Sequence, residues 1–509
     1  MNDPEGQVTR QEEAIDHWRR RAGLALAPIV FLVLWWVPLA GLAENAHRLL
    51  AVFGLVVTLW LTEAIPLAVT ALLGPTLCVV CGIASDKEMF KNFGHPIIFL
   101  FLGSFLLAEA MLHHGLNRRI AFAILSLRWV GQSPARILWA FAGISGFLSM
   151  WISNTTAAAM MLPIGVAILS EMARRQSERE GREVRFTDLK YGTGLMLATA
   201  FAASIGGMAT PVGTPPNLIA VGFIEKSQGL RITFFQWMAF GVPLAVVMLA
   251  FLGFYLNRAC PAEPGLLDGS AAWIQAERAK LGPLSRGERN VLIAFSVTVI
   301  LWLLPGVVAV GAGVNAPLFK ALERHSPEAA ASLLGATLLF VLPVNLRRGE
   351  FTIGWTQARG IDWGTILLFG GGLALGDAMF STGLARWIGE GLAHSLNAHT
   401  ALGLTVLFTV IAVLLTETTS NTATANMVVP VAIAVAQAAQ VNPVPPALAA
   451  CLGASLAFML PVSTPPNAIV FGTGCVPLLK MVKHGIVLDL FGMAAIIVVV
   501  HWWLPRFIG

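Results

Sequence analysis

Long apolar segments dominate this sequence and restrict how it can fold. Of 509 residues, 56% are hydrophobic and only 12% are charged, whereas a soluble domain usually carries about 25% charged residues. A helix needs about 20 consecutive apolar residues to cross the hydrocarbon core of a bilayer. Because stretches of that length recur along the whole chain, we predict an all-α polytopic membrane protein that lies mostly in the lipid bilayer.

The apolar stretches predict about 11 transmembrane helices by the length criterion. These spans are 23–43, 47–63, 66–84, 94–112, 190–224, 235–257, 289–310, 330–346, 361–383, 446–475 and 486–505. Two further apolar segments, 136–173 and 399–437, are each long enough for two half-spans and carry hydroxyl and amide residues at their centres. The polar arm 1–22 precedes an apolar run without a small-residue cleavage site, which predicts a retained first span.

Basic residues gather in short segments between the spans, a pattern that predicts membrane orientation rather than nucleic-acid binding. We expect these segments in the cytoplasm: the arm 1–22, the loop 174–190, the linker 258–288, Arg347 with Arg348, and Lys480 with Lys483. Because the number of crossings is odd, we expect the C-terminal Gly509 on the outer side of the cell inner membrane. This scheme requires 136–173 and 399–437 to be re-entrant hairpins of opposite orientation.

Three motif pairs recur in the same order in the two halves of the chain. FLGSFLLAEAMLHHGL from Phe101 matches FGGGLALGDAMFSTGL from Phe369, SNTTAAAMMLPI from Ser153 matches SNTATANMVVPV from Ser420, and ATPVGTPPN ending at Asn217 matches MLPVSTPPN ending at Asn467. The offsets are 268, 267 and 250 residues. We therefore predict two repeats, 23–257 and 289–509, and the charge pattern predicts that they are inverted in the membrane.

The Ser-Asn-Thr clusters place hydrogen-bonding side chains in apolar surroundings. Hydroxyls, amide oxygens and unwound carbonyls can coordinate alkali cations, while amide and helix N-terminal N–H groups can face an anion. Isolated Ser or Thr residues also join transmembrane helices to one another. Two clusters at equivalent positions favour a binding function over that structural role.

Consecutive prolines interrupt two predicted spans, at Pro215-Pro216 and at Pro465-Pro466. A helix cannot continue through them, so the spans 190–224 and 446–475 are predicted to be broken helices with freed backbone groups. A simple proline kink would not need the flanking Thr and Asn residues in both copies. We therefore expect each break to line a binding site.

Four acidic residues lie within or beside the apolar stretches, where a buried acid is a candidate proton relay. Glu63 is at a break between spans, and Glu109 and Asp377 are near span ends, which favours solvated or capping roles. Glu417 precedes the second cluster and is the only one of the four whose position suggests ion coupling. Neither the Ser-Asn-Thr nor the Thr-Pro-Pro-Asn pair contains Lys, Arg or His, so an anion would need bound cations and helix N-termini.

These motifs resemble the divalent anion/sodium symporter family of dicarboxylate, citrate and sulfate carriers. The resemblance covers essentially the whole chain and includes the stretch 455–470, SLAFMLPVSTPPNAIV. It implies a homodimeric carrier, not an enzyme, that imports a C4-dicarboxylate such as succinate, malate or fumarate with sodium ions. The implied transport is alternating access by an elevator mechanism.

The resemblance also implies which residues bind. A first sodium site would comprise Ser149, Ser153, Asn154 and the Gly213 carbonyl, and a second Thr416, Thr419, Asn421 and the Ser463 carbonyl. The substrate would contact Asn154, Thr155, Thr214, Asn421, Thr422, Thr464 and Pro465. Ser149 has both Thr416 and Thr419 as loose counterparts, so the second ligand shell is less well defined.

Several alternatives to this function remain open from the sequence alone. The family contains anion exchangers, and neutral hydroxyls and amides suit citrate or sulfate as well as a dicarboxylate. A channel could reuse inverted hairpins, but the motifs look like paired sites rather than a continuous pore lining. An intramembrane enzyme would need a catalytic His or Asp, which the motif clusters lack.

Overall fold

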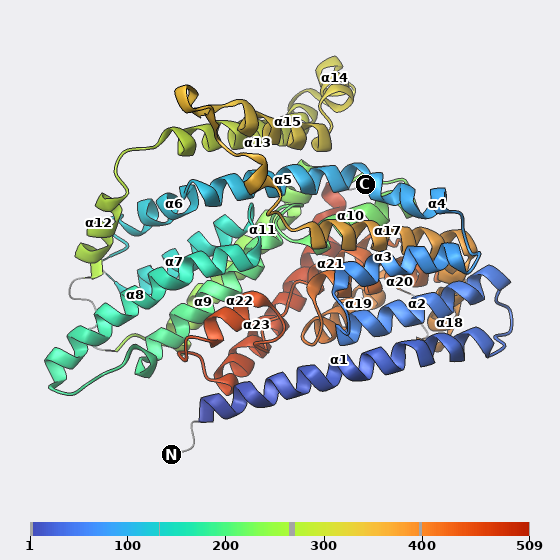
Figure 1. The fold of residues 1–509 in the computed structure, drawn as a ribbon, viewed down its shortest axis with the longest axis horizontal. Helices are drawn as coiled ribbons and strands as arrows, with labels where there is room; N and C mark the ends of the chain where they lie inside the picture. Colours follow the sequence, from blue (N-terminus) through green and yellow to red (C-terminus); the bar gives the residue numbers. More distant parts are fainter. Residues whose placement is uncertain (1–3, 132, 264–269, 397–399, 508–509) are drawn as a thin grey trace. The chain divides into compact units, whose positions relative to one another are not determined.

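The computed structural model describes residues 4–131, 133–263, 270–396 and 400–507 (Figure 1), so the expected outer terminus at Gly509 lies outside the described residues. Apart from one short antiparallel pair, β1 (Pro343–Asn345) with β2 (Glu350–Phe351), the regular structure in these ranges is helical. The predicted all-α class is confirmed. The predicted span 330–346 is too long, because the helix ends at Val341 and β1 follows.

The chain divides into two compact units, each built from separated segments. Unit 1 comprises 1–98, 219–231 and 363–454. Its helices are α1 (Pro4–Trp36), α2 (Glu44–Thr62), α3 (Leu67–Val80), α4 (Asp86–Phe90), α17 (Trp363–Thr382), α18 (Leu384–Leu396), α19 (Ala401–Thr416), α20 (Asn421–Ala438) and α21 (Val444–Gly453). Within it, α1 runs along α2, and α19 packs against α20 and α21 (Figure 1).

Unit 2 comprises 99–218, 232–362 and 455–509. Its helices are α5 (Pro96–His113, from Phe99 on), α6 (Leu116–Leu125), α7 (Pro134–Ser149), α8 (Asn154–Glu180), α9 (Lys190–Gly207), α11 (Phe234–Ala259), α12 (Ser270–Lys280), α13 (Arg286–Ala312), α14 (Pro317–His325), α15 (Glu328–Val341), α16 (Trp355–Ala358), α22 (Pro465–Phe471) and α23 (Leu478–Val498). Helix α10 (Pro215–Gln228) begins in unit 2 and continues into unit 1. In unit 2, α9 packs against α7, α8, α11 and α22.

Seven described segments are long and apolar enough to cross a membrane. They are α2, Asp86–His113, α8, α11, α13, α17 and Leu478–Arg506, and four shorter helices, α3, α15, α19 and α21, are also apolar. Helix α1 is not among the seven, because only its part after Arg21 is apolar. The predicted number of spans and their orientation stay predictions.

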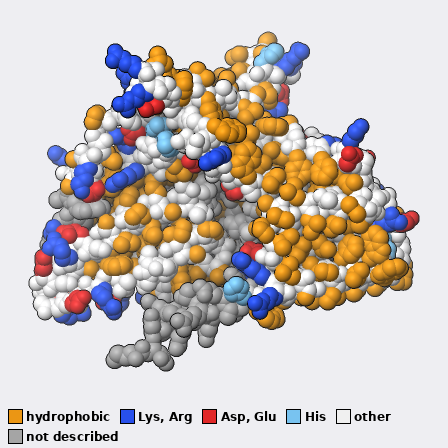
Figure 2. Space-filling model, viewed as in Figure 1, with side chains coloured by type: hydrophobic (Ala, Val, Ile, Leu, Met, Phe, Trp, Pro, Cys, Tyr) orange, Lys and Arg blue, Asp and Glu red, His pale blue; other side chains and the backbone are white. Residues whose placement is uncertain are grey.

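Large apolar side chains are exposed at many positions, as expected for helices that face lipid. Val310 is 78% exposed, Phe254 68% and Leu414 62%. Figure 2 shows hydrophobic side chains spread widely over the surface in view. This distribution agrees with a protein whose surface is solvated by a bilayer.

Both predicted broken helices are interrupted, and each helix after the break begins at the first proline of its pair. Helix α9 ends at Gly207 before α10, and α21 ends at Gly453 before α22. Proline fits the first helical turn because the N–H it lacks would have no intrahelical partner there. The sequence therefore fixes where each second half-helix starts.

A fully buried asparagine donates hydrogen bonds to the unwound backbone at each break. The Asn217 amide donates to the carbonyls of Gly207 (2.9 Å) and Thr210 (2.7 Å). The Asn467 amide donates to the carbonyls of Ala457 (2.9 Å) and Leu460 (3.0 Å), the positions 250 residues later. These bonds pair carbonyls that the unwound segments would otherwise leave buried without a partner.

We predict that Asn217→Ala and Asn467→Ala each lower the stability of the protein. Each change leaves two buried carbonyls without their donor, which costs about 1–3 kcal/mol. The midpoint of thermal unfolding in detergent should fall for both variants relative to wild type. Asn257→Ala is the control, because Asn257 is only partly buried and its amide donates to Gly253 of its own helix at 2.8 Å and to Ala135 only at 3.5 Å. Equal midpoints for Asn217→Ala and this control would contradict the assigned role.

Candidate functional site

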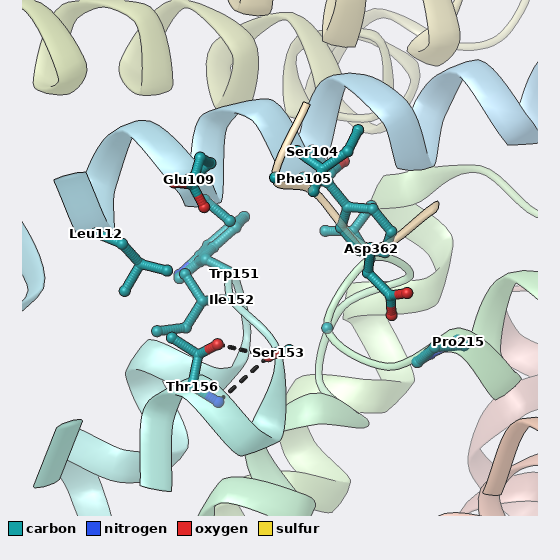
Figure 3. Close-up of a pocket in the computed structure, with 15 residues that line it drawn as sticks. Ser104, Phe105, Glu109, Leu112, Trp151, Ile152, Ser153, Thr156, Pro215 and Asp362 are labelled. Atoms are coloured by element: carbon teal, nitrogen blue, oxygen red, sulfur yellow. Dashed lines mark hydrogen bonds between the residues drawn. The ribbon is translucent and has the colours of Figure 1, made fainter. Parts of the chain in front are cut away.

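The first Ser-Asn-Thr cluster forms the tip between α7 and α8. Ser153 is the N-cap of α8, where its hydroxyl accepts a hydrogen bond from the Thr156 N–H at 3.2 Å and pairs with the Thr156 hydroxyl at 2.8 Å (Figure 3). Serine suits this position because its short side chain can satisfy an N–H of the first turn. Asn154 and Thr155 are the first residues of the helix, next to its electropositive N-terminus.

Neutral oxygen atoms gather at this tip. The buried Ser149 hydroxyl donates to Oδ1 of Asn154 at 2.7 Å. A Cβ atom on Gly213 would lie 2.6 Å from the Gly207 carbonyl oxygen and 3.0 Å from that of Ser149, and a Cβ on Gly207 would lie 2.4 Å from Asn154 Oδ1. Glycine at both positions therefore lets carbonyl and amide oxygens come close together, a ligand type that suits sodium.

The second cluster has the same local arrangement within unit 1, at the tip between α19 and α20. Ser420 is the N-cap of α20 and accepts from the Ala423 N–H at 3.1 Å. The Thr416 hydroxyl lies 2.8 Å from Asn421 Oδ1 and 2.7 Å from the Ala454 carbonyl oxygen. Thr416 is thus the structural counterpart of Ser149, because each contacts the asparagine five residues later.

Thr419 has a different role in its tip. Its hydroxyl lies 2.8 Å from the Leu415 carbonyl and 2.8 Å from the Thr424 hydroxyl, so it supports the turn rather than Asn421. The Thr422 carbonyl accepts from the Asn426 amide at 3.0 Å, in the first turn of α20.

The remaining predicted residues lie at the ends of the two unwound segments, where the next helices begin. Thr214 directly precedes α10, while Ser463 and Thr464 directly precede α22, which begins at Pro465 and packs against α8 and α9 within unit 2. Thr464 is 5% exposed, and its hydroxyl has no hydrogen-bond partner among the described residues. A buried hydroxyl in this state can accept a ligand without first losing an internal bond. Of the second predicted sodium set, Thr416, Thr419 and Asn421 belong to unit 1 and Ser463 to unit 2.

A cavity of about 220 Å³ lies at the first tip (Figure 3). Ser153, Gly213 and Pro215 line it together with two carboxylates, Glu109 of α5 and Asp362, which lie on opposite sides of the cavity. Two negative side chains make this cavity more favourable for a cation than for a dianion. The sequence suggested a solvated or capping role for Glu109 and gave no indication of Asp362.

The other acidic residues occupy distinct surroundings. Glu63 follows α2 as its C-cap, at the expected break. Asp377 is partly exposed, and its carboxylate forms an ion pair with Lys226 at 2.7 Å that the sequence did not indicate. Glu417 is 3% exposed at the C-cap of α19. No group of three or more His, Cys, Asp or Glu side chains that could hold a metal ion occurs among the described residues.

Two relatives are similar to almost the whole chain. The sodium-dependent dicarboxylate transporter SdcS of Staphylococcus saprophyticus is 35% identical over 492 residues, which cover 96% of this chain and 92% of that protein. SdcS of Staphylococcus aureus strain USA300 is 36% identical over 493 residues, with the same shares covered.

Two solved structures share the fold at low sequence identity. The YdaH transporter of Alcanivorax borkumensis superimposes with a TM-score of 0.55 at 14% identity, covering 97% of this chain and 98% of that one. MtrF of Neisseria gonorrhoeae, described within a class of antimetabolite efflux pumps, superimposes with a TM-score of 0.52 at 15% identity, covering 84% of each chain. At these identities the likeness concerns the fold alone.

A family model places the chain in a transporter family. The model described as the sodium:sulfate symporter transmembrane region matches residues 18–508. Together with the relatives of more than 30% identity, this match covers the part of the chain that holds both tips and both breaks. The chain is a multi-pass membrane protein of the sodium:sulfate symporter family, which is a family of transporters and not of enzymes.

Proposed function

We propose that this protein imports a C4-dicarboxylate such as succinate, malate or fumarate together with sodium ions by alternating access. The names of the two SdcS relatives support sodium and a dicarboxylate, and the family description supports sodium coupling. Two alternatives within the family are exchange of one anion for another and sodium-coupled uptake of citrate or sulfate.

The matching tips are the observation that carries this proposal. In each, a hydroxyl at the end of one helix contacts the asparagine that begins the next, at 2.7 Å for Ser149 and 2.8 Å for Thr416. An asparagine held through Oδ1 keeps its amide N–H groups for another partner. One side of each tip can therefore hold a cation while the other presents N–H donors to a carboxylate.

The first proposed sodium site uses Ser149, Ser153, Asn154 and the Gly213 carbonyl, and the close approach at Gly207 and Gly213 supports it. For the second site, Thr416 and Asn421 are supported by their mutual contact, and Thr419 by its place in the same turn. Ser463 as a ligand stays a prediction from the family. The proposed substrate contacts are Asn154, Thr155, Thr214, Asn421, Thr422, Thr464 and Pro465.

The electrostatics favour sodium binding before the anion. Two negative charges enter a low-dielectric site at great cost unless positive charge accompanies them. The N-termini of α8 and α20 each supply only part of a positive charge. Sodium bound at the tips would supply the rest, and with more than two ions per dianion each cycle would carry net positive charge inward.

The expected setting is the cell inner membrane, with the N-terminus in the cytoplasm and the C-terminus outside. The basic segments support this orientation.

We also propose a homodimer that works by an elevator mechanism, with the two repeats inverted in the membrane. The equivalent hydrogen bonds of Asn217 and Asn467 support the repeat relationship.

Uptake into proteoliposomes tests the proposed function directly. We expect a sodium gradient to drive accumulation of radiolabelled succinate, and an inside-negative potential to accelerate it. Asn154→Asp and Asn421→Asp should each reduce the rate at least about tenfold, because a carboxylate removes the amide donor and adds negative charge beside the substrate. Asn442→Asp, at an exposed position, should transport normally. Equal uptake without sodium, or motif variants that match this control, would contradict the proposal.

Gly207→Ala tests the first sodium site without changing a charge. The added methyl group would lie 2.4 Å from Asn154 Oδ1 and displace a proposed ligand. We expect sodium-driven uptake to fall at least about tenfold, since a small displacement of a coordinating group can cost two orders of magnitude. Gly143→Ala on α7 is the control, because a Cβ there meets no atom within 4 Å. Normal sodium dependence in Gly207→Ala would argue against this site.

A further inference from the structure

An arginine of the N-terminal helix contacts the second tip. Within unit 1, the guanidinium of Arg19 donates one N–H to the Thr418 carbonyl at 3.3 Å and another to the Glu63 carboxylate at 3.4 Å. Thr418 lies in the turn between α19 and α20, two residues after Thr416 and three before Asn421. Arg19 is 399 residues away in the sequence, and its side chain is 26% exposed.

The packing of α1 against the end of α2 puts this guanidinium in place. Gly23 is one helical turn after Arg19, so the two share a face of α1. A Cβ on Gly23 would lie 2.0 Å from the Thr62 hydroxyl and 2.9 Å from the Ala64 side chain. Only glycine therefore lets α1 approach this closely to the residues on either side of Glu63.

Glu63 adopts an unusual backbone conformation. Its φ is +47°, in the left-handed region, and only Gln440 shares a positive φ among the described non-glycine residues. This conformation is unfavourable for a residue with a side chain, and glycine would adopt it more readily. A glutamate here is consistent with a use for its carboxylate, which in this structure receives Arg19.

We propose that Arg19 is a positioning residue that latches the second tip to α1 and α2. The Arg19 latch consists of Arg19, Glu63 and the Thr418 carbonyl. It restrains the turn that holds Thr416, Thr419 and Asn421. Less conformational entropy is therefore lost when sodium binds. The inference rests on the proposed function, because it assigns sodium to this tip.

Two other roles for Arg19 lead to different results. As a topological anchor it would be equivalent to Arg20 and Arg21, which are exposed on the same basic run. As a source of positive potential it would act by charge alone. If Arg19 acted by charge alone, Arg19→Lys would leave transport unchanged, and Glu63→Gln would strengthen anion binding. The latch requires the planar guanidinium, which can reach two acceptors at once, and also the Glu63 carboxylate.

The experiment measures sodium-driven succinate uptake at varied sodium, in proteoliposomes with equal amounts of each variant. We expect Arg19→Gln and Glu63→Gln to raise the KM for sodium about three- to tenfold, a modest factor because the groups are partly exposed. The maximal rate at saturating sodium should change less than about twofold. Arg19→Lys should fall between wild type and Arg19→Gln, while Arg20→Gln and Arg21→Gln should match wild type.

Three outcomes would overturn the latch. Arg19→Gln could behave like Arg20→Gln, Arg19→Lys could match wild type, or Glu63→Gln could lower the KM for succinate while Arg19→Gln raises it. If wild type takes up succinate without sodium dependence, the proposed function fails instead.

Labelling of the tip tests the latch even in variants that do not transport. Thr418 is exposed, and Thr418→Cys keeps the backbone carbonyl that Arg19 contacts. Of the native cysteines, Cys81 is partly exposed and is replaced by Ser, whereas the other four are buried. In sodium-free detergent, a maleimide should modify position 418 faster when Arg19→Gln or Glu63→Gln is also present, and not faster with Arg20→Gln. Equal rates in all four proteins would refute the latch.

Discussion

Backbone groups released at a helix break must find partners inside the protein when the break lies at membrane depth. Here the double prolines release carbonyls at two equivalent places, and a buried asparagine captures two of them in each case. The remaining unwound backbone can then serve as a ligand without destabilising the fold. The same prolines that stop the helix thus create both the need for Asn217 and Asn467 and the opportunity for a binding site.

The two tips share a plan but differ in detail, and the differences have physical consequences. Ser149 sits beside glycines whose missing side chains let oxygens crowd together, and acidic side chains line the adjacent cavity. Thr416 instead lies between Asn421 and the Ala454 carbonyl, and the turn beside it is held by Arg19. The close approach at Gly207 and Gly213 is thus a feature of the first tip, and the contact with Arg19 is a feature of the second.

Much of the fold could be predicted because its signals are local. Prolines end helices whatever surrounds them, and hydrophobic length predicts membrane helices, so both breaks lie where expected. Ser153 and Ser420 cap helices as short hydroxyl side chains commonly do. The choice between Thr416 and Thr419 as the partner of Asn421 could not be made, because both hydroxyls precede it closely and only the folded turn separates them. Contacts over long sequence separations, such as Asp377 with Lys226, leave no pattern in a single sequence.

In the proposed mechanism, sodium organises the tips and thereby creates the anion site. Thermal unfolding of the detergent-solubilised protein tests it most directly, because a ligand that binds the native state raises the midpoint. Sodium chloride alone should raise the midpoint relative to choline chloride at equal ionic strength. Succinate should add a further rise in sodium and none in choline. If succinate raised the midpoint equally in both salts, sodium would not be needed to create the anion site.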